Sequence, residues 1–396
     1  MAKAHICMLT LEHAPNDDRI FEKEARSLRA AGYQVSILCK ADADGRIRSF
    51  VGRQVINPDG ALDFELDGIP VRAVKADESP VGRLLHKVQS DRFSRAFIRK
   101  ALEINADAYH AHEPVSFYLG LLITRKNGKK LIFDSHESWM GGSRKEQMIK
   151  RLYLRELKYL ITANSISRGH LLGLNPALQT EIIYNFPDPE VFHLPFNEKK
   201  FERITLAHDG ILLFNRGLKT MAEVMHMLKK SHPEVRLKIV GEGGEAERRY
   251  LEELRKQGVD NIDVSGWLPY RQVPAALHDC SIGLIMKTRI PVNNVLGGPS
   301  IKLFNYLASG MAVLDVNLPE SSFFLNQSRS GVSVRVPTAE NIYHALIRLI
   351  EDTELLKSYC RRSFEQSRKW QWTSEAKKLN AFYEEVVFNE KPWIFR

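Results

Sequence analysis

Short apolar runs alternate with amphipathic segments along almost the whole chain, and this alternation limits its possible folds more than any other feature. In the first half, the strand-like runs HICMLTL (5–11) and QVSILCK (34–40) enclose a helical pattern over residues 19–33. Farther on, DAYHAH (107–112) and KLIFDSHE (130–137) enclose a second helical pattern that ends at a glycine. Strands alternating with helices predict an α/β fold with a parallel, doubly wound sheet.

A further helix is expected over residues 145–164. The apolar residues that suggest one helical stripe there are Met148, Leu152, Leu157, Leu160 and Ile161. Such spacing is typical of a helix that packs one face on a sheet.

The alternation stops at a proline-rich segment and then restarts, which predicts two domains. At 396 residues the chain exceeds the size at which one core usually stops growing. Ligands of open α/β sheets bind at the carboxyl ends of the strands, so we expect a central cleft that both domains face. The expected divisions are a first domain (1–186), a linker (187–203), a second domain (204–366) and a closing helix (367–396).

The bulk composition narrows the class of protein. No run of about 18 apolar residues is present, and the start of the chain reaches acidic residues too soon for a secretory signal. The four cysteines lie far apart in the sequence, which suits free thiols in a reducing compartment. We therefore expect a cytoplasmic protein.

The net charge of +9 comes largely from basic residues in the first half of the chain. They form three groups: Arg83, Lys87, Arg92, Arg95, Arg99 and Lys100; Arg125, Lys126, Lys129 and Lys130; and Arg144, Lys145, Lys150, Arg151, Arg155 and Lys158. A solvated helix face and a surface that holds anionic lipid headgroups both remain open. Nucleic acid is disfavoured, because no exposed aromatic residues are interleaved with these cations.

Polar residues end two strands of the first domain. In HAHEP, His112 stands at the strand end, where the cleft is expected, whereas His110 is read as a satisfied core residue. No third ligand completes a zinc set with these histidines, so no metal site is predicted. In DSHES, His136 and Glu137 either line the cleft or hold its loops together.

The segment PNDDR opens the first helix. One of Asp17 and Asp18 is expected to cap that helix. A cation at a helix start is disfavoured by the helix dipole, so we expect Arg19 to have a carboxylate partner or another role.

The stretch IVGEGGEA fits the dinucleotide-binding pattern through Gly241, Gly243 and Ala246. Glu242 and Glu245 would repel a pyrophosphate there. The stretch also follows the second strand of its domain, whereas the nucleotide-binding turn usually follows the first. A dehydrogenase is therefore disfavoured.

Two segments of the second domain contain candidate anion-binding sites. In GILLFNRGLK, Arg216 and Gly217 open a helix, a suitable place for a diphosphate. In GPSIKLFNYLASGMAVL, Ser300 is expected to cap a helix on which Lys302 and Asn305 share one face.

In their order and spacing these motifs resemble the retaining glycosyltransferases of family 4, which have the GT-B fold of two tandem Rossmann-like domains. The segments that carry the resemblance are PNDDRIFEKEARSLRAAGYQVSIL, DAYHAHEP, KLIFDSHE, IIYNFPDPEVF, HDGILLFNRGL, LKIVGEGGE, IDVSGWLP and GPSIKLFNYLASGMAVL. The resemblance implies a first domain that binds the acceptor and a second that binds the nucleotide sugar. It also implies a closing helix that crosses back onto the first domain.

The resemblance implies roles for single residues. Arg216 and Lys302 hold the donor diphosphate, and His112 lies near the transferred sugar. Asn305 stands where most members carry a glutamate that grips the ribose, and Gly297 replaces a second glutamate. The remaining expected site residues are Gly217, Gly241 and Ser300 on the donor side, and Asp18, Arg19, Glu113, His136 and Glu137 on the acceptor side.

The sequence thus predicts a hexosyltransferase that transfers a sugar, with retention, from a nucleoside-diphosphate sugar to an acceptor hydroxyl. The expected acceptor is a glycan or a lipid-linked molecule in cell-surface polysaccharide or glycolipid assembly, on the inner face of the cytoplasmic membrane. No cofactor or metal is expected. The alternative is a catalytically inactive GT-B protein that binds nucleotide or scaffolds a glycan-assembly complex. Because an amide lacks the charge of a carboxylate, Asn305→Glu is expected to tighten nucleotide binding.

Overall fold

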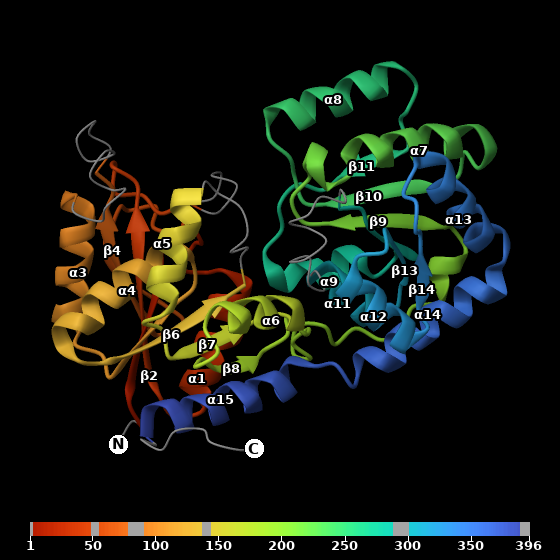
Figure 1. Cartoon of the computed structure of the whole chain (residues 1–396). Helices are drawn as coiled ribbons and strands as arrows, with labels where there is room; N and C mark the ends of the chain where they lie inside the picture. Colours follow the sequence, from red (N-terminus) through yellow and green to blue (C-terminus); the bar gives the residue numbers. More distant parts are fainter. Residues whose placement is uncertain (1–2, 49–54, 78–90, 137–143, 288–300, 389–396) are drawn as a thin grey trace. The chain divides into compact units, whose positions relative to one another are not determined.

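The computed structural model describes residues 3–48, 55–77, 91–136, 144–287 and 301–388, and the chain divides into two compact units (Figure 1). The N-terminal unit consists of Met1–Tyr184 together with Ser374–Arg396. The C-terminal unit consists of Asn185–Thr373. The last helix thus begins in one unit and continues in the other.

The N-terminal unit is built on an eight-stranded sheet in the order β3-β4-β2-β1-β5-β6-β7-β8. Its strands are β1 (His5–Thr10), β2 (Gln34–Ala41), β3 (Asp63–Leu66), β4 (Ile69–Lys75), β5 (Ala108–Ala111), β6 (Lys130–Ser135), β7 (Tyr159–Thr162) and β8 (Gln179–Ile182). Its helices are η1 (Asp18–Ala25), α1 (Arg26–Ala30), α3 (Arg92–Ile104), α4 (Pro114–Asn127), α5 (Arg144–Leu154), α6 (Ser165–Leu174) and α15 (Trp372–Phe388). All described strand pairs are parallel except β3–β4, which confirms the predicted parallel sheet.

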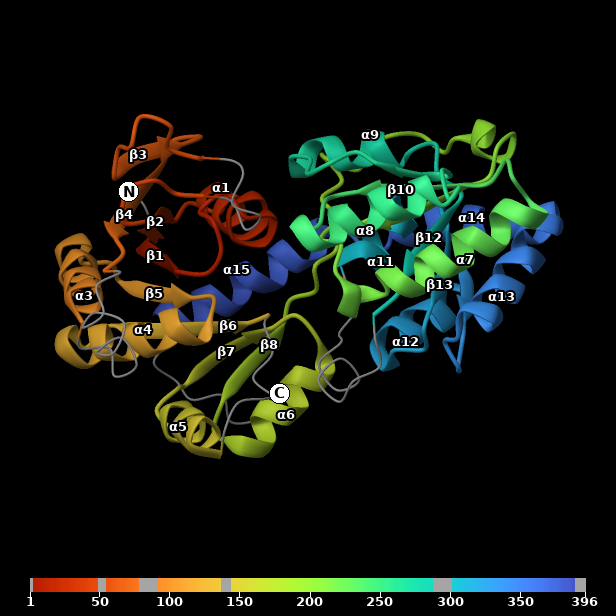
Figure 2. The ribbon, with the colours of Figure 1, turned by 90° about the horizontal axis from the view of Figure 1, so that it is seen from above.

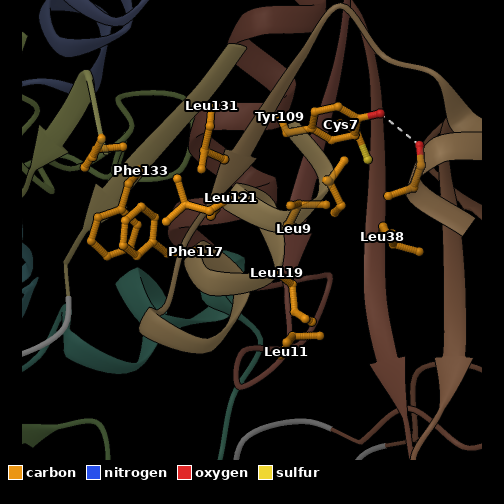
Figure 3. Close-up of a cluster of buried hydrophobic side chains, with 14 of the residues drawn as sticks. Cys7, Leu9, Leu11, Leu38, Tyr109, Phe117, Leu119, Leu121, Leu131 and Phe133 are labelled. Atoms are coloured by element: carbon orange, nitrogen blue, oxygen red, sulfur yellow. Dashed lines mark hydrogen bonds between the residues drawn. The ribbon is translucent and has the colours of Figure 1, made fainter. Parts of the chain in front are cut away.

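Alternate residues of the central strands point to opposite faces of this sheet. Leu9, Tyr109 and Phe133 pack into an apolar cluster with residues of α3 and α4, and Phe117 of α4 stacks on Phe133 at 4.7 Å between ring centroids (Figure 3). Figure 2 shows α3 and α4 on one side of β1 and β5, with α1 and α15 on the other. Because side chains alternate along a strand, His110 of β5 points toward the α1 and α15 side.

The helix predicted over residues 145–164 is wrong beyond Leu154. There α5 ends, and Leu160 and Ile161 are buried in β7, which pairs with β6 and β8. Met148 and Leu152 of α5 are 57% and 52% exposed and form no buried stripe. A short apolar run fits a strand as well as a helix, and pairing with distant strands decides the outcome.

The C-terminal unit has a six-stranded parallel sheet in the order β11-β10-β9-β12-β13-β14. Its strands are β9 (Thr205–Asp209), β10 (Arg236–Val240), β11 (Ile262–Val264), β12 (Ile282–Ile285), β13 (Ala312–Asp315) and β14 (Gly331–Ser333). Its helices are η2 (Glu198–Phe201), η3 (Phe214–Arg216), α7 (Leu218–Ser231), α8 (Glu245–Lys256), η4 (Tyr270–Gln272), α9 (Val273–Leu277), α11 (Ile301–Ala308), α12 (Pro319–Ser328), α13 (Ala339–Glu351) and α14 (Thr353–Ser367).

The strand order reverses once in each sheet, between β1 and β5 and between β9 and β12. Ligands of doubly wound sheets bind outside the carboxyl ends of the strands at such a switch point. In the N-terminal unit, the residues there follow Thr10 and Ala111; in the C-terminal unit, they follow Asp209 and Ile285.

The structure also describes the cysteines and the apolar character of the helices. All four cysteines are free and buried, and burial raises the pKa of the Cys7 and Cys280 thiols to about 12. Among the described helices, none combines the length and the apolar character needed to cross a membrane.

Candidate active site

The helix that follows β1 carries an arginine into the protein interior. Asp17 caps η1: one of its carboxylate oxygens accepts hydrogen bonds from the backbone N–H groups of Arg19 and Ile20, at 2.9 and 3.1 Å. The expectation that an aspartate caps this helix is confirmed. Asp18, the other candidate, lies half-buried in the first turn of η1, where a carboxylate is favoured by the helix dipole.

Arg19 is 2% exposed and forms a bidentate ion pair with Asp134 at the end of β6. Its Nε and Nη2 donate to the two carboxylate oxygens at 2.6 and 3.0 Å, and its Nη1 donates to the carbonyl oxygen of Ile183 at 3.0 Å. The expected carboxylate partner of Arg19 is thus confirmed. A bidentate ion pair of this kind fixes the orientation of both side chains in addition to bringing opposite charges together.

Three histidines and a glutamate surround this ion pair. We call Arg19, Glu24, His110, His112, Asp134 and His136 the N-terminal polar cluster. His136 Nδ1 lies 3.1 Å and His112 Nδ1 3.7 Å from the same oxygen of Asp134. The rings of His110 and His112 lie 4.3 Å apart. His110 Nδ1 is also 2.6 Å from the hydroxyl of Tyr383, which α15 contributes from the end of the chain.

Burial controls the protonation of this cluster. It lowers the pKa of His110 and His112, an effect strengthened by their neighbouring histidines, so both rings are neutral near pH 7. Burial together with the Asp134 charge raises the pKa of Glu24 well above its usual range. Although burial opposes it, the Arg19 guanidinium holds the pKa of Asp134 well below its usual range. Within the cluster, Arg19 is therefore held as a cation and Asp134 as an anion.

Four members of the cluster also have the ligand types of a metal site. Glu24, His110, His112 and Asp134 each offer a ligand atom, and these atoms all lie within 4.8 Å of one another. Arg19 already donates to both oxygens of Asp134 and approaches Glu24 to 3.1 Å. A metal ion would have to share both carboxylates with this guanidinium. Sequence reasoning found no third ligand because Glu24 and Asp134 are brought to the histidines only by the tertiary fold.

Glu113 holds the turn that follows β1. Its carboxylate accepts hydrogen bonds from the backbone N–H groups of residues 11–13 and from the Thr10 hydroxyl, the last at 2.6 Å. It also forms a reciprocal capping box with Ser116 at the start of α4. These contacts give the expected acceptor-side Glu113 a supporting role in the structure. The expected site residues Glu137, Gly297 and Ser300 lie outside the described residues.

The glycines of the second domain bring backbone segments close together. Gly241 has a φ of +147°, and a Cβ there would collide with the carbonyl oxygen of Gly210. Gly217 ends η3 in the left-handed conformation and precedes α7. The pattern that resembles a dinucleotide fingerprint thus joins the loops after β9 and β10, as the isolated bridge between Leu212 and Gly243 also shows.

Lys302 and Asn305 lie on α11 beside the end of β9, and both are buried. Asn305 Nδ2 donates to the carboxylate of Asp209 at 2.7 Å. Neither Lys302 Nζ nor Asn305 Oδ1 has a hydrogen-bond partner in the part of the chain that the structure describes. Lys302 and Asn305 therefore lie near the start of one helix, as the sequence predicted. Asp209 was missed from the sequence, although its place at the end of a predicted strand, directly before a glycine, is typical of a binding residue.

Several charges act on Lys302. Burial lowers its pKa to about 7; the Asp209 carboxylate opposes this shift, and the Arg216 and Lys287 cations add to it. Burial lowers the pKa of His208 well below its usual range, and the cations of Lys302 and of Arg216, which is half-buried at the end of η3, add to this shift. Cations gathered around a helix start form a favourable site for an anionic ligand.

Sequence comparison relates both units to known enzymes. Residues 19–185 match the model of a glycosyl transferase 4-like domain, and residues 194–366 match that of the glycosyl transferases group 1. The chain belongs to glycosyltransferase family 4. This glycosyltransferase is 24% identical over 376 residues to a phosphatidyl-myo-inositol mannosyltransferase of Mycolicibacterium smegmatis, covering 91% of this chain and 88% of the relative.

Solved structures establish the GT-B fold of this glycosyltransferase. HepE from Anabaena in complex with UDP-glucose matches with a TM-score of 0.73 at 13% identity, over 96% of this chain and 100% of that one. Sucrose-phosphate synthase from Thermosynechococcus elongatus matches with a TM-score of 0.72 at 13% identity, over 97% and 99%. The predicted α/β fold with two Rossmann-like parallel-sheet domains is thereby confirmed.

Proposed function

We propose that this glycosyltransferase is a retaining hexosyltransferase that uses a nucleoside-diphosphate sugar. The observation that carries this proposal is the buried ammonium group of Lys302. It has no hydrogen-bond partner among the described residues, and the positive charge of Arg216 repels it. A diphosphate would supply the missing negative charge. Since HepE, a structural neighbour, was solved with UDP and UDP-glucose, a UDP sugar is the first donor to test.

The chemistry follows from these charges. As the bond between the sugar and the diphosphate breaks, negative charge grows on the leaving phosphate, and Lys302, Arg216 and the start of α11 stabilise it. These groups allow transfer without a metal ion. The acceptor hydroxyl gives its proton to the leaving phosphate on the same face of the sugar, so the anomeric configuration is retained. The N-terminal polar cluster, with His112, belongs to the acceptor side.

The proposal is tested with a panel of UDP and GDP sugars, with and without EDTA. Transfer of an α-linked sugar from an α-linked donor, identified by NMR of the product and undiminished by EDTA, is the expected result. Inversion at the anomeric carbon would refute retention. Tight nucleotide binding without any sugar transfer would favour the alternative of a catalytically inactive nucleotide-binding or scaffold protein.

Arg216→Ala is expected to lower kcat roughly tenfold, because one charge-assisted contact to the leaving diphosphate is lost. The melting temperature should change little, since Arg216 is only half-buried. Arg249→Ala is the matched control, because Arg249 is a 75% exposed cation on α8. Equal kcat values for Arg216→Ala and the wild type would remove Arg216 from the site.

We also propose a lipid-linked or glycan acceptor and peripheral binding to the inner face of the cytoplasmic membrane. On α5 the exposed Met148 and Leu152 share a face with the exposed Arg151, and Arg155 follows the helix. Apolar side chains among cations suit a surface of anionic lipid. The 24% identical relative is named for a phosphatidylinositol acceptor, which favours the same idea.

Replacing Met148 and Leu152 together by serine is expected to weaken binding to phosphatidylglycerol vesicles roughly tenfold, because two apolar side chains no longer enter the lipid interface. Co-sedimentation with vesicles measures the effect. Phe323→Ser is the control, since Phe323 is 59% exposed on α12 of the other unit. Unchanged sedimentation of the α5 variant, or equal loss in the control, would refute this docking face.

A further inference from the structure

The amide of Asn305 is held in one orientation by Asp209. A carboxylate only accepts hydrogen bonds, so the Asn305 group at 2.7 Å from it must be the NH2 group. Asp209 is itself fixed, because its backbone N–H donates to the Tyr306 hydroxyl at 2.8 Å, and that hydroxyl donates to the carbonyl oxygen of Leu284 at 3.2 Å. The carbonyl oxygen Oδ1 of Asn305 is therefore turned away from Asp209.

This orientation leaves an acceptor and a cation close together. Asn305 is 3% exposed and its Oδ1 accepts no hydrogen bond from any described residue. Lys302 lies three residues earlier on the same face of α11, and its Nζ would be 2.9 Å from a Cβ at Gly210. Any other residue at position 210 would therefore crowd the ammonium group of Lys302. Two buried polar groups without described partners thus stand at the carboxyl end of β9, beside the Asp209 carboxylate.

The chemistry of these groups specifies a ligand. An ammonium group takes a phosphate oxygen, and neighbouring amide and carboxylate oxygens take hydroxyl hydrogens. A ribose that carries a diphosphate presents both kinds of group within a few bonds. Hydrogen bonds to a charged acceptor are about twice as strong as those between neutral groups. Asp209 therefore adds the negative charge that Asn305 lacks.

We propose that Asp209 and Asn305 form one hydroxyl-recognition pair for the ribose of the donor, in which Asp209 is the specificity-determining residue. This inference rests on the proposed nucleoside-diphosphate donor. It also reverses the expectation from the sequence that Asn305→Glu tightens nucleotide binding. A glutamate at position 305 would place a second carboxylate beside Asp209, and like charges at this distance repel each other.

The experiment is isothermal titration calorimetry at about pH 6 with UDP, GDP, their 2′-deoxy analogues and inorganic pyrophosphate. The wild type should bind the better ribonucleotide roughly tenfold more tightly than its deoxy analogue. Asp209→Asn should weaken binding of the ribonucleotide roughly tenfold and abolish this preference. Its affinity for pyrophosphate, which has no ribose hydroxyl, should fall clearly less than its affinity for the ribonucleotide, whereas a general disturbance of α11 would weaken both alike.

Two further variants separate charge from structure. Asn305→Glu alone should weaken ribonucleotide binding, and Asp209→Asn combined with Asn305→Glu, which exchanges the two groups, should recover affinity to within about threefold of the wild type. Equal affinity of the wild type for ribo- and deoxynucleotides, or an Asp209→Asn variant that keeps the preference, would overturn the inference while the donor proposal stands. If the wild type bound neither nucleotide, the proposed donor class would be wrong and the inference would fall with it.

Discussion

Arg19→Met is expected to lower the free energy of unfolding of the N-terminal unit by about 3–5 kcal/mol, the usual cost of removing one partner from a buried ion pair. Asp134 is fully buried, and besides Arg19 its nearest titratable neighbours are Glu24 and histidines. Burial keeps two of these histidines neutral near pH 7, and a carboxyl group cannot replace the lost cation. Methionine fills much of the same volume but leaves this carboxylate without its fixed cation. The loss should therefore exceed that of any exposed ion pair in the chain.

Hydrogen exchange of the β5 and β6 amides, followed by mass spectrometry, measures the stability of this unit separately from the other. Arg125→Met is the matched control, because Arg125 and Glu156 form an ion pair with side chains 47% and 43% exposed. Exposed pairs contribute at most about 1 kcal/mol. Arg19→Met combined with Asp134→Leu should regain part of the loss, since no carboxylate then remains at position 134. Equal losses for Arg19→Met and Arg125→Met would contradict this account.

The sequence predicted the fold because alternation of strands and helices is a local signal. It also predicted that Asp17 or Asp18 caps the first helix, because aspartate is a favoured capping residue. It predicted a carboxylate partner or another role for Arg19, because the helix dipole disfavours a cation at a helix start. It failed at residues 159–162, where Leu160 and Ile161 suit a helix or a strand and only pairing with β6 and β8 decides. Local periodicity carries no information on such pairing.

The candidate site shows the same limit. Lys302 and Asn305 were found because they are neighbours on one helix, whereas Asp209 is 96 residues away along the chain. Asp134 of β6 meets the histidines at the end of β5 through the order of strands in the sheet, and Glu24 meets them through the packing of η1. A single sequence places residues at strand ends, but it does not tell which strand ends are adjacent.

The affinity for a nucleotide sugar is expected to fall about tenfold for each pH unit above about 7, because only the ammonium form of Lys302 attracts the diphosphate and its pKa is lowered to about 7. The diphosphate of a nucleotide sugar is fully ionised from about pH 5 upward, so its own charge does not vary over this range. Titration calorimetry of a UDP sugar between about pH 6 and pH 9 measures the slope. Burial of Lys302 sets the position of the midpoint first, and the Asp209 carboxylate and the Arg216 and Lys287 cations adjust it.

Lys302→Arg distinguishes this titration from others, since a guanidinium stays charged throughout the range. Its affinity should be independent of pH, even if the larger side chain lowers it. The ligand-free protein should respond in the opposite sense. Because the pKa of Lys302 is lower in the folded than in the unfolded chain, the unfolded chain binds more protons between about pH 7 and 10.5, and the contribution of Lys302 to stability rises with pH there. A pH-independent affinity in the wild type would mean that the diphosphate is bound by permanently charged groups instead, and Lys302 would lose its assigned role.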